Sequence, residues 1–434
     1  MKKILIVGNH SCSNRGDAAI LRGLIDFLES EFQEYDIDIT SRYTDGAQFF
    51  FGHKVFKDTL SLARKQYTSI WGRIEKRLVN RIVLPKYLDK KITSPKLLPK
   101  AYKEFSEFIQ PYDLVIQVGG SFFVDLYGVA QFEAAAVAIR EEKPFLIIGH
   151  SVGPFKDPNV AKVANKVFKQ ANSLILRESV SEEHLDEVNV NSNHYVLGSD
   201  TAWLIDPTKY NPDIENLERR YIKDKPTVAI TMRELAPFDV RLGVSQAQYE
   251  AKVAHLCQSL IESGYNVIAL STCTGFDNYH RDDRIPALRV GRMVNDSENY
   301  SVVMDELTDI ELGTLLSKCV LTIGTRLHSA ILSMRFGTPA FAVYYEHKSQ
   351  GILNKIDMGD YSIDINSLDT ESFKNRVLDK IANIESEREA MNQKLSVEIE
   401  RCKSVIRSEL AKVEVSSVEL ERPSPVVSNP VSEV

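Results

Sequence analysis

The sequence lacks several features that mark membrane-spanning, secreted and disulfide-stapled proteins. It contains no run of about 18 apolar residues, so we expect no membrane-spanning helix. The apolar run 4–7 is too short for a signal-peptide core, and no small-residue cleavage site follows it. The five cysteines stand singly without a CxxC pair, which argues against a disulfide framework or a zinc site. These absences predict a cytoplasmic protein without a structural metal.

The chain also lacks an excess of basic residues and the common nucleotide-binding motifs. It has 53 Lys and Arg against 60 Asp and Glu, a formal net charge of −7, which argues against a nucleic-acid partner. Neither GxGxxG nor GxxxxGK[ST] occurs, which argues against a classical nicotinamide-dependent enzyme and against a P-loop nucleotide-binding protein. What is present is an ordinary globular composition over 434 residues, a length that predicts two domains with additional segments.

Short apolar runs alternate with stretches of helical periodicity along most of the chain. The predicted strands are 3–8, 114–118, 145–148 and 173–176 in the first half, and 227–231, 266–270, 320–323 and 340–343 in the second. The predicted helices between them include 18–31, 246–263, 309–316 and 330–336. Because strands that alternate with helices build parallel sheets, the sequence predicts an α/β fold with two Rossmann-like domains facing each other across a cleft. We place these domains at residues 1–205 and 206–369.

A segment of the first domain, residues 54–100, stands out by its charge. It holds 13 Lys or Arg against three acids, and Trp71, Ile74, Leu78 and Ile82 recur at helical spacing within it. A basic amphipathic helix with an aromatic anchor is able to lie on an anionic membrane surface. A basic insertion that packs on its own domain explains the pattern as well, and both interpretations stay open here.

The end of the chain differs in another way. Residues 370–412 have the pattern of a charge-rich, solvated helical segment. After residue 413 a mixture of Ser, Pro and Val lacks periodicity, which predicts a disordered tail over 413–434.

Candidate site residues follow the predicted strands, because ligands of open parallel sheets bind beyond the carboxyl ends of the strands. After the first strand, Asn14, Arg15, Gly16 and Asp17 crowd the start of a helix. Asp17 either caps this helix or faces the cleft, and on spacing alone we favour capping.

The next two strands of the first domain end in similar polar loops. Gly119, Gly120 and Ser121 permit a close approach of the backbone to a ligand or to another element. His150 and Ser151 follow the third strand. His150 is either a ligand group or a buried structural histidine, and the structural interpretation is favoured.

The strongest candidate lies after strand 320–323, where Gly324 makes a turn and Thr325 is a plausible N-cap for the following helix. Arg326 and His328 then occupy the first turn, where free N–H groups and the positive end of the helix dipole favour an anion. A solvent-exposed arginine beside a packed histidine is the alternative. Since two cationic side chains repel the positive end of a dipole, we expect an anionic ligand that arginine can grip with two parallel bonds.

Further charged residues follow other strands of the second domain, at the same predicted edge of the sheet. Arg233 follows the first strand of the second domain, and Glu346 and Lys348 follow strand 340–343. Arg233, Arg326, His328 and Lys348 are therefore able to converge on one small polyanion, while Glu346 is a candidate base. A charged surface loop remains an equal alternative for Glu346 and Lys348.

Taken in order, these motifs resemble the polysaccharide pyruvyl transferase family. The matching series comprises residues 14–17, 119–120, 150–154, the run Arg177-Glu-Ser179, Asp200 and residues 324–328. The likeness covers about residues 1–360, and the runs 117–128 and 233–243 resemble family members of colanic acid biosynthesis in particular. The resemblance implies a glycosyltransferase-B-like fold. It also implies phosphoenolpyruvate as donor and co-substrate, with no separate cofactor and no metal.

The resemblance further implies a hexose acceptor in an exopolysaccharide or its lipid-linked repeat unit. For the colanic type this is a terminal galactose, converted into a 4,6-ketal with release of phosphate. A peripheral position at the inner face of the cytoplasmic membrane is compatible with this role. A sugar-nucleotide-dependent glycosyltransferase and a non-catalytic assembly scaffold are the alternatives.

The predicted roles divide between the two domains. We expect Arg326 and His328, on the turn with Gly324 and Thr325, to hold the donor, and Arg233 and Lys348 to help neutralise its phosphate. Asp17 or Glu346 is expected to deprotonate the acceptor, and His328 or another acid to protonate C3 of the donor. The acceptor or cleft residues are expected to be Asn14, Arg15, Gly16, Gly119, Gly120, Ser121, His150, Ser151, Arg177, Ser179 and Asp200.

Overall fold

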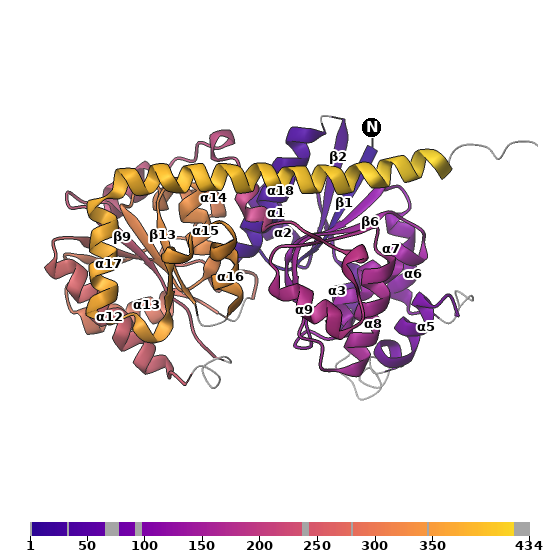
Figure 1. The fold of residues 1–434 in the computed structure, drawn as a ribbon, viewed down its shortest axis with the longest axis horizontal. Helices are drawn as coiled ribbons and strands as arrows, with labels where there is room; N and C mark the ends of the chain where they lie inside the picture. The colour runs from indigo at the N-terminus through magenta and orange to yellow at the C-terminus, as the bar shows by residue number, and fades with distance from the viewer. Residues whose placement is uncertain are drawn as a thin grey trace, which may run out of the picture.

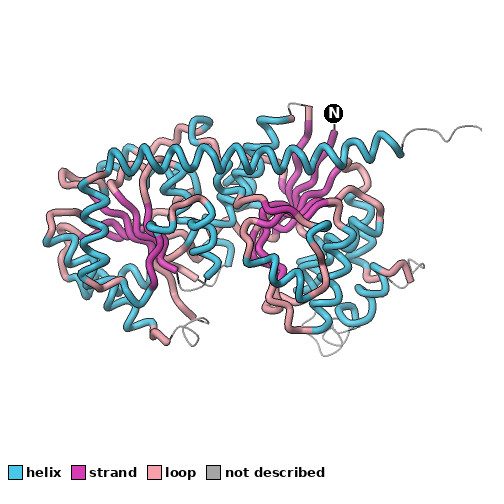
Figure 2. The backbone as a smooth tube through the Cα atoms, viewed as in Figure 1, coloured by secondary structure: helices cyan, strands magenta, loops and turns pink. Residues whose placement is uncertain are grey.

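Two parallel β-sheets, each covered by helices, lie next to each other, and one long helix runs along both (Figure 1). This computed structural model describes residues 2–32, 34–65, 78–91, 98–236, 243–278, 281–344 and 347–420. Figure 2 shows the strands of each sheet gathered at the centre of its domain, with helices around them. The prediction of two Rossmann-like parallel-sheet domains is therefore confirmed.

The sheet of the N-terminal domain has eight strands in the order β3-β2-β1-β4-β6-β7-β8, with β5 paired to β6. Their bounds are β1 Lys2–Asn9, β2 Tyr35–Ser41, β3 Val55–Lys57, β4 Leu114–Gln117, β5 Gly120–Phe123, β6 Phe145–Val152, β7 Ser173–Leu176 and β8 Val196–Leu197. The helices are α1 Arg15–Glu31, α2 Thr44–Phe51, α3 Thr59–Lys65, α5 Leu84–Leu88, α6 Lys100–Ile109, α7 Glu133–Arg140, α8 Pro158–Gln170 and α9 Val180–Glu187, with a π-helical turn at Val79–Val83. The strand order reverses between β1 and β4, which is where ligands of such sheets bind.

The sheet of the C-terminal domain has six strands in the order β11-β10-β9-β12-β13-β14, which is the 3-2-1-4-5-6 order of a Rossmann domain. The strands are β9 Thr227–Thr231, β10 Asn266–Leu270, β11 Tyr300–Val302, β12 Leu321–Gly324, β13 Ala340–Tyr344 and β14 Ser362–Asp364. The helices are α10 Glu215–Tyr221, α12 Gln246–Glu262, α13 Arg284–Val294, α14 Asp309–Leu316, α15 Leu327–Arg335, α16 His347–Lys355, α17 Glu371–Ala382 and α18 Ile384–Leu420. The reversal here lies between β9 and β12.

All eight predicted strands are present, and the strands that the sequence did not reveal are short or alternate in polarity. In β2 the acids at positions 36 and 38 interrupt the apolar positions, and β3, β8, β11 and β14 are no longer than three residues. An apolar run is the sequence signal of a strand buried on both faces, and these strands lack it.

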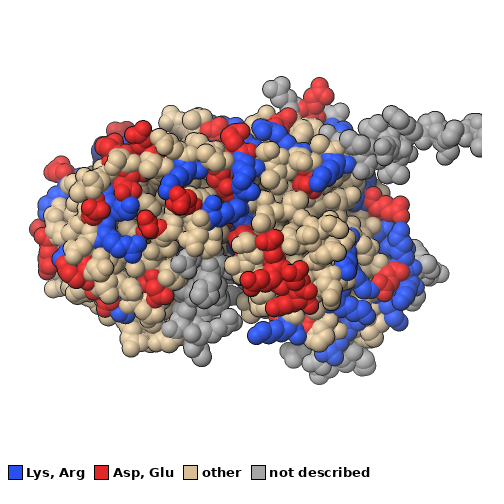
Figure 3. Space-filling view, in the orientation of Figure 1, with Lys and Arg blue, Asp and Glu red and all other residues tan. Residues whose placement is uncertain are grey.

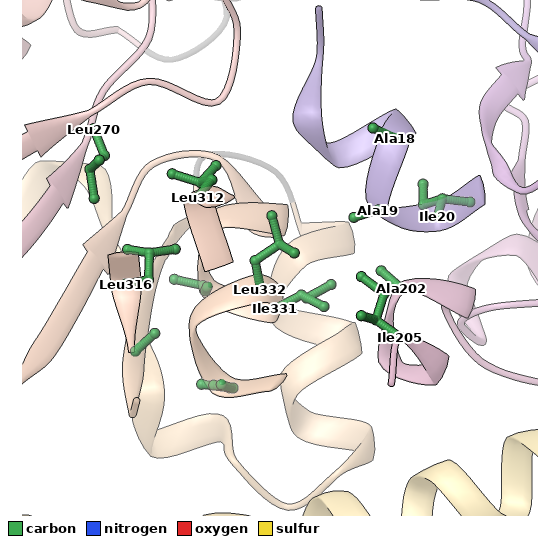
Figure 4. Packing of buried hydrophobic residues seen from close by; sticks show 14 of the residues in the cluster. Ala18, Ala19, Ile20, Ala202, Ile205, Leu270, Leu312, Leu316, Ile331 and Leu332 are labelled. Carbon is green, nitrogen blue, oxygen red and sulfur yellow. The ribbon is translucent and has the colours of Figure 1, made fainter. Parts of the chain in front are cut away.

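One cluster of buried hydrophobic residues extends over both domains, and a second lies within the N-terminal domain. Small residues of α1, Ala18 and Ala19, lie opposite Ile331 of α15, and Ala202 of the short 3-10 helix η5 (Thr201–Leu204) completes the contact (Figure 4). Alanine allows helix axes to approach closely, so α1 packs against both domains. This apolar contact fixes how the carboxyl ends of the two sheets face each other.

Buried ion pairs add to this interface. Arg22 of α1 makes two hydrogen bonds of 3.0 and 3.1 Å to Asp309 of α14, and both side chains are buried. Arg15 pairs with Glu306 and donates to the Cys12 carbonyl oxygen at 2.8 Å. Burial and pairing together show that Arg15, expected among the cleft residues, ties the domains together instead of lining the cavity between them.

The C-terminal helices correct one prediction. The segment 370–412 is helical as predicted, but α18 is docked along both domains and is not simply a solvated helix (Figure 1). Leu395, Cys402 and Ile406 are buried on one face of α18. The buried Glu398 accepts a hydrogen bond of 2.5 Å from Ser199. The helix α18 continues to Leu420, past residue 413 where the disordered tail was predicted to start, and the rest of the tail lies outside the described residues.

The basic segment 54–100 falls partly outside the described residues, among them Trp71 and Ile74. Leu78 and Ile82, which are described, are 48% and 44% exposed. Figure 3 shows Lys and Arg side chains gathered on this end of the N-terminal domain, in the region of α5, α6 and α8. Membrane contact through this segment stays a prediction.

Candidate active site

The start of α1 brings the N-terminal domain into contact with the helix that carries His328. Asn14 caps α1, its side chain accepting a hydrogen bond of 3.1 Å from the Gly16 N–H. The expectation that Asp17 caps this helix is therefore wrong, and Asp17 faces the cavity between the domains. A Cβ added at Gly16 would lie 2.6 Å from Nδ1 of His328, so only glycine permits this approach.

The start of α15 is built differently from the prediction. The helix begins at Leu327, and Arg326 occupies the N-cap position without a side-chain cap. The hydroxyl of Thr325, the expected N-cap, shares a hydrogen bond of 2.8 Å with the hydroxyl of Tyr249 instead. His328 lies in the first turn of α15 and lines the cavity. The turn therefore places the histidine, and not the threonine, at the cavity.

Asp200 links the two domains through buried polar contacts. One carboxylate oxygen of Asp200 lies 2.8 Å from Nη1 of Arg177 and 3.3 Å from Nε2 of His328. Arg177 in turn donates to the hydroxyls of Ser151 and Ser121, each at 2.7 Å. These contacts join Ser121 of β5, Ser151 of β6 and the segments after β7 and β8, which carry Arg177 and Asp200, to α15 of the other domain. The residues were predicted to share the cleft, and the structure brings them together.

A cavity of about 710 Å³ lies where these elements meet. Its lining includes six of the predicted site residues: Asn14, Asp17, Gly120, Ser121, Arg177 and His328. It also includes residues that the sequence analysis missed: His10, Ser11, Ile20, Arg42, Tyr43, Phe122, Tyr127, Gln131 and Arg281. Arg42 directly follows β2, so recognition of that strand would have revealed it, whereas nothing in the local sequence marks Arg281. The volume lies within the range of small-molecule sites.

Several predicted residues lie behind the cavity lining and not in it. His150 is fully buried, with Nδ1 2.7 Å from the Ser151 carbonyl oxygen and its ring 4.5 Å from that of Phe123. A Cβ at Gly119 would lie 2.5 Å from the Gly149 carbonyl oxygen, so this glycine serves the contact between neighbouring strands. Ser179 precedes α9 without capping it.

The predicted donor residues fall into three groups. Arg326 makes a bidentate ion pair with the buried Asp283, with distances of 2.7 and 2.8 Å, and is absent from the cavity lining. The Nε of Arg233 donates to the Glu234 carbonyl oxygen at 3.1 Å. Glu346 lies outside the described residues, and for Lys348 the structure describes only its place in α16.

The charges at the cavity shift the pKa values of two carboxyl groups in opposite directions. Burial raises the pKa of Asp17 to about 6, although His328, the Asn14 side chain and Arg177 partly oppose it. For Asp200 burial also acts to raise the pKa, but the charge and hydrogen bond of His328 and the charge of Arg177 outweigh it and lower the pKa. At neutral pH Asp200 is thus a fixed anion, while Asp17 titrates close to the working range of a proton-transfer group.

The raised pKa of Asp17 predicts a stability effect with a definite sign. The folded protein holds the proton of Asp17 more tightly than the unfolded chain does. The protonated carboxyl therefore contributes its full stabilisation below about pH 4, the ordinary pKa of an aspartate, and this stabilisation is lost as the pH rises through about 6. We therefore expect Asp17→Asn to raise the free energy of unfolding at pH 7, by on the order of 2 kcal/mol. Urea unfolding of both proteins at pH 4 and pH 7 measures this, and an advantage of the variant that is larger at pH 4 would contradict it.

Within the described part of the chain, no group of three or more His, Cys, Asp or Glu side chains is arranged to hold a metal ion. The helices in the same part include none that is long and apolar enough to cross a membrane.

Two facing Rossmann-like domains with a polar cavity between their strand ends define the glycosyltransferase-B class of fold. Solved structures share it. HepE of Anabaena, determined in complex with UDP-glucose, has a TM-score of 0.59 at 13% identity, covering 96% of this chain and 100% of HepE. A putative UDP-N-acetylglucosamine 2-epimerase from Listeria monocytogenes has a TM-score of 0.55 at 14% identity, covering 99% and 100%. At these identities the likeness concerns the fold alone.

The family follows from the sequence comparison. The model of the polysaccharide pyruvyl transferase family matches residues 14–347, and the chain belongs to this family. The chain is also 45% identical over 390 residues to the amylovoran biosynthesis protein AmsJ of Erwinia amylovora, covering 89% of this chain and 94% of AmsJ. The resemblance inferred from the ordered motifs is thereby confirmed. The particular likeness to colanic acid enzymes is not tested and stays a prediction.

Proposed function

We propose that the protein moves the pyruvyl group of phosphoenolpyruvate onto a hexose of an exopolysaccharide or of its lipid-linked repeat unit, releasing phosphate. Family membership supports the transferase class and a glycan acceptor. The observation that carries the proposal is the cavity between the domains, where Asp17, with its pKa raised to about 6, lies among the cationic side chains of Arg42, Arg177 and Arg281.

The cationic side of the cavity matches the charge of the donor. Phosphoenolpyruvate carries a carboxylate and a phosphate on one carbon, so it needs several donors in a small volume. Arg42, Arg281 and His328 line the cavity and are proposed to bind these groups directly. Arg326 lies further back, where its charge is close enough to oppose the rise in the pKa of Asp17. Its proposed contribution is positive potential and the position of the α15 turn.

The proposed reaction uses the two protons of the acceptor hydroxyls. C3 of the donor gains a proton and becomes a methyl group, and the first hydroxyl oxygen attacks C2. The C2–O bond to phosphate breaks, the second hydroxyl oxygen attacks C2 to close the ketal, and its proton leaves with phosphate. Asp17 is suited to accept a hydroxyl proton, since with a pKa of about 6 it is mostly ionised at neutral pH. His328, oriented through Nε2 by Asp200, is proposed to supply the proton to C3.

The acceptor sugar and the ring positions that receive the pyruvyl group are also part of the proposal. A terminal galactose ketalised at positions 4 and 6 is what the colanic type implies. AmsJ, by its name, acts in the biosynthesis of amylovoran. We place the reaction in the cytoplasm at the inner face of the membrane, where a lipid-linked repeat unit is accessible.

Ligand-induced stabilisation tests the donor. Because a ligand of the folded state raises the melting temperature, phosphoenolpyruvate is expected to stabilise the protein, whereas UDP- and GDP-sugars are not. The alternative, a sugar-nucleotide-dependent glycosyltransferase, is suggested by the fold shared with HepE, which was solved with UDP-glucose. Stabilisation by a nucleotide sugar without stabilisation by phosphoenolpyruvate would overturn the proposed donor. Release of phosphate from phosphoenolpyruvate only in the presence of an acceptor glycan would exclude a scaffold role.

A further inference from the structure

One wall of the cavity is aromatic, and the proposed proton transfers do not use it. Phe122, in β5, and Tyr127, in the turn that follows, both line the cavity. Their ring centroids are 6.0 Å apart with an edge-to-face angle of 66°. Phe122 also contacts the ring of His10, whose centroid is 4.0 Å away at 75°, and the buried ring of His150, whose centroid is 5.9 Å away. The rings of Tyr127, Phe122 and His10 therefore form a packed row, a geometry that aromatic groups favour.

The turn that carries Tyr127 is held in place by hydrogen bonds of its backbone and of the Asp125 side chain. The N–H of Tyr127 donates to the Val124 carbonyl oxygen at 3.2 Å. The side chain of Asp125 accepts hydrogen bonds from the N–H groups of Lys156 and Asp157, at 2.6 and 3.2 Å. Although Tyr127 is a large aromatic residue on a fixed turn, it is 48% exposed. An aromatic side chain held at the mouth of a cavity in this way is a surface for a ligand to cover.

The aromatic wall suits a sugar ring better than it suits the donor. The face of an aromatic ring carries partial negative charge, so it disfavours the carboxylate and phosphate of phosphoenolpyruvate. The apolar C–H face of a pyranose packs against such a ring, while the sugar hydroxyls require hydrogen-bonding partners. Asn14, whose side-chain oxygen caps α1, and Gln131 place polar side chains in the same cavity.

The wall is also near the proposed base. After burial, the negative charge of Asp17 is the largest influence that raises the pKa of the Tyr127 hydroxyl, while Arg233 and Arg42 oppose it. Because Asp17 lines the same cavity as Phe122 and Tyr127, a sugar ring stacked on this wall has its hydroxyls on the side of the proposed base, while Arg42, Arg281 and His328 of the same lining are assigned to the donor.

We propose that Phe122 and Tyr127 form the acceptor platform, on which a hexopyranose stacks with two hydroxyls directed toward Asp17. This inference rests on the proposed pyruvyl transfer, since it assigns the acceptor side of that reaction. It makes the aromatic wall a determinant of acceptor affinity and leaves donor affinity to the arginines and His328.

Kinetics with two substrates test the platform. We expect Tyr127→Ala to raise the KM for a β-galactose-terminated oligosaccharide about tenfold or more, with the KM for phosphoenolpyruvate changed less than twofold. Tyr127→Phe keeps the ring and is expected to retain most of the acceptor affinity. Leu126→Ala is the matched control, because Leu126 is the neighbouring residue, is 68% exposed and does not line the cavity. An unchanged acceptor KM in Tyr127→Ala, or an equal rise of both KM values, would overturn the platform.

A binding experiment separates this inference from the proposed function. Titration calorimetry of the unmodified protein and of Tyr127→Ala with methyl glycosides of galactose, glucose and mannose requires no turnover. Weaker binding by Tyr127→Ala than by Leu126→Ala, at equal melting temperatures, supports the platform even if no pyruvylated product forms. If product forms but none of the glycosides binds, or all bind the variants equally, the platform is wrong while pyruvyl transfer stands.

Discussion

Replacing Asp17 by Asn is expected to lower the rate of pyruvyl transfer by about 10²–10⁴-fold while the protein still binds phosphoenolpyruvate. The amide keeps the shape of the carboxylate at the start of α1 but is unable to accept the proton of an acceptor hydroxyl. Donor binding is expected to persist or to strengthen, because the variant removes a negative charge that lines the same cavity. Acceptor-dependent phosphate release measures the rate, and the rise in melting temperature with phosphoenolpyruvate measures binding.

The pH profile distinguishes a base from a merely structural carboxylate. Since the pKa of Asp17 is raised to about 6, the rate of the unmodified protein is expected to fall as the pH drops through that value. The residual activity of Asp17→Asn should lack this acidic limb. Asp45→Asn, which changes an exposed carboxylate in the first turn of α2, is the control and should leave rate and profile unchanged. A rate for Asp17→Asn within a few-fold of the unmodified protein would remove Asp17 from the mechanism.

The second large effect is expected from Arg326→Ala. Asp283 is 1% exposed and forms a bidentate ion pair with Arg326, so the substitution leaves a buried carboxylate without its counter-charge. Loss of one partner of a buried pair costs about 3–5 kcal/mol of unfolding free energy. The sequence-based expectation that Arg326 holds the donor implies a loss of donor binding, and the ion pair with Asp283 adds this loss of stability. Urea unfolding at neutral pH measures it.

The double variant Arg326→Ala with Asp283→Asn separates structure from donor binding. Removing both charges is expected to restore most of the stability, because no unpaired buried charge remains. If Arg326 acts by positioning the α15 turn, the double variant also regains part of the stabilisation by phosphoenolpyruvate. If Arg326 grips the donor directly, the double variant stays unresponsive, and the role in positioning is wrong. A single variant as stable as the unmodified protein would contradict the importance of the ion pair.

The local sequence was sufficient to predict a strand wherever the strand's own residues form an apolar run. The runs 227–231, 266–270 and 173–176 each have an apolar centre, and each forms a strand with these bounds. Loops after such strands gather at one edge of a parallel sheet, so residues as distant as Asp17, Ser121 and Arg177 were expected to share a cleft. Family motifs then associated the cleft with pyruvyl transfer before any contact was known.

Both helix caps were misplaced because more than one residue near each helix start was able to fill the capping role. Asn14 and Asp17 are both acceptable capping residues at the start of α1, and spacing alone favoured Asp17. The backbone of Asn14 is extended and its side chain reaches the Gly16 N–H, which leaves Asp17 to face the cavity. The same ambiguity misplaced the cap of α15 at Thr325, whose hydroxyl bonds to Tyr249 from another helix.

The sequence by itself determined the parallel α/β architecture and the family, because strand periodicity and ordered motifs are properties of local segments. Only the tertiary structure decided what each charged residue does. Arg326 faces Asp283 and not open solvent, and Arg42 and Arg281 line the cavity from opposite domains. The reason is physical: the pKa and the availability of a charged group depend on partners and burial that come from distant parts of the chain. These partners exist only once α1 has packed against α15 and the two sheets face each other.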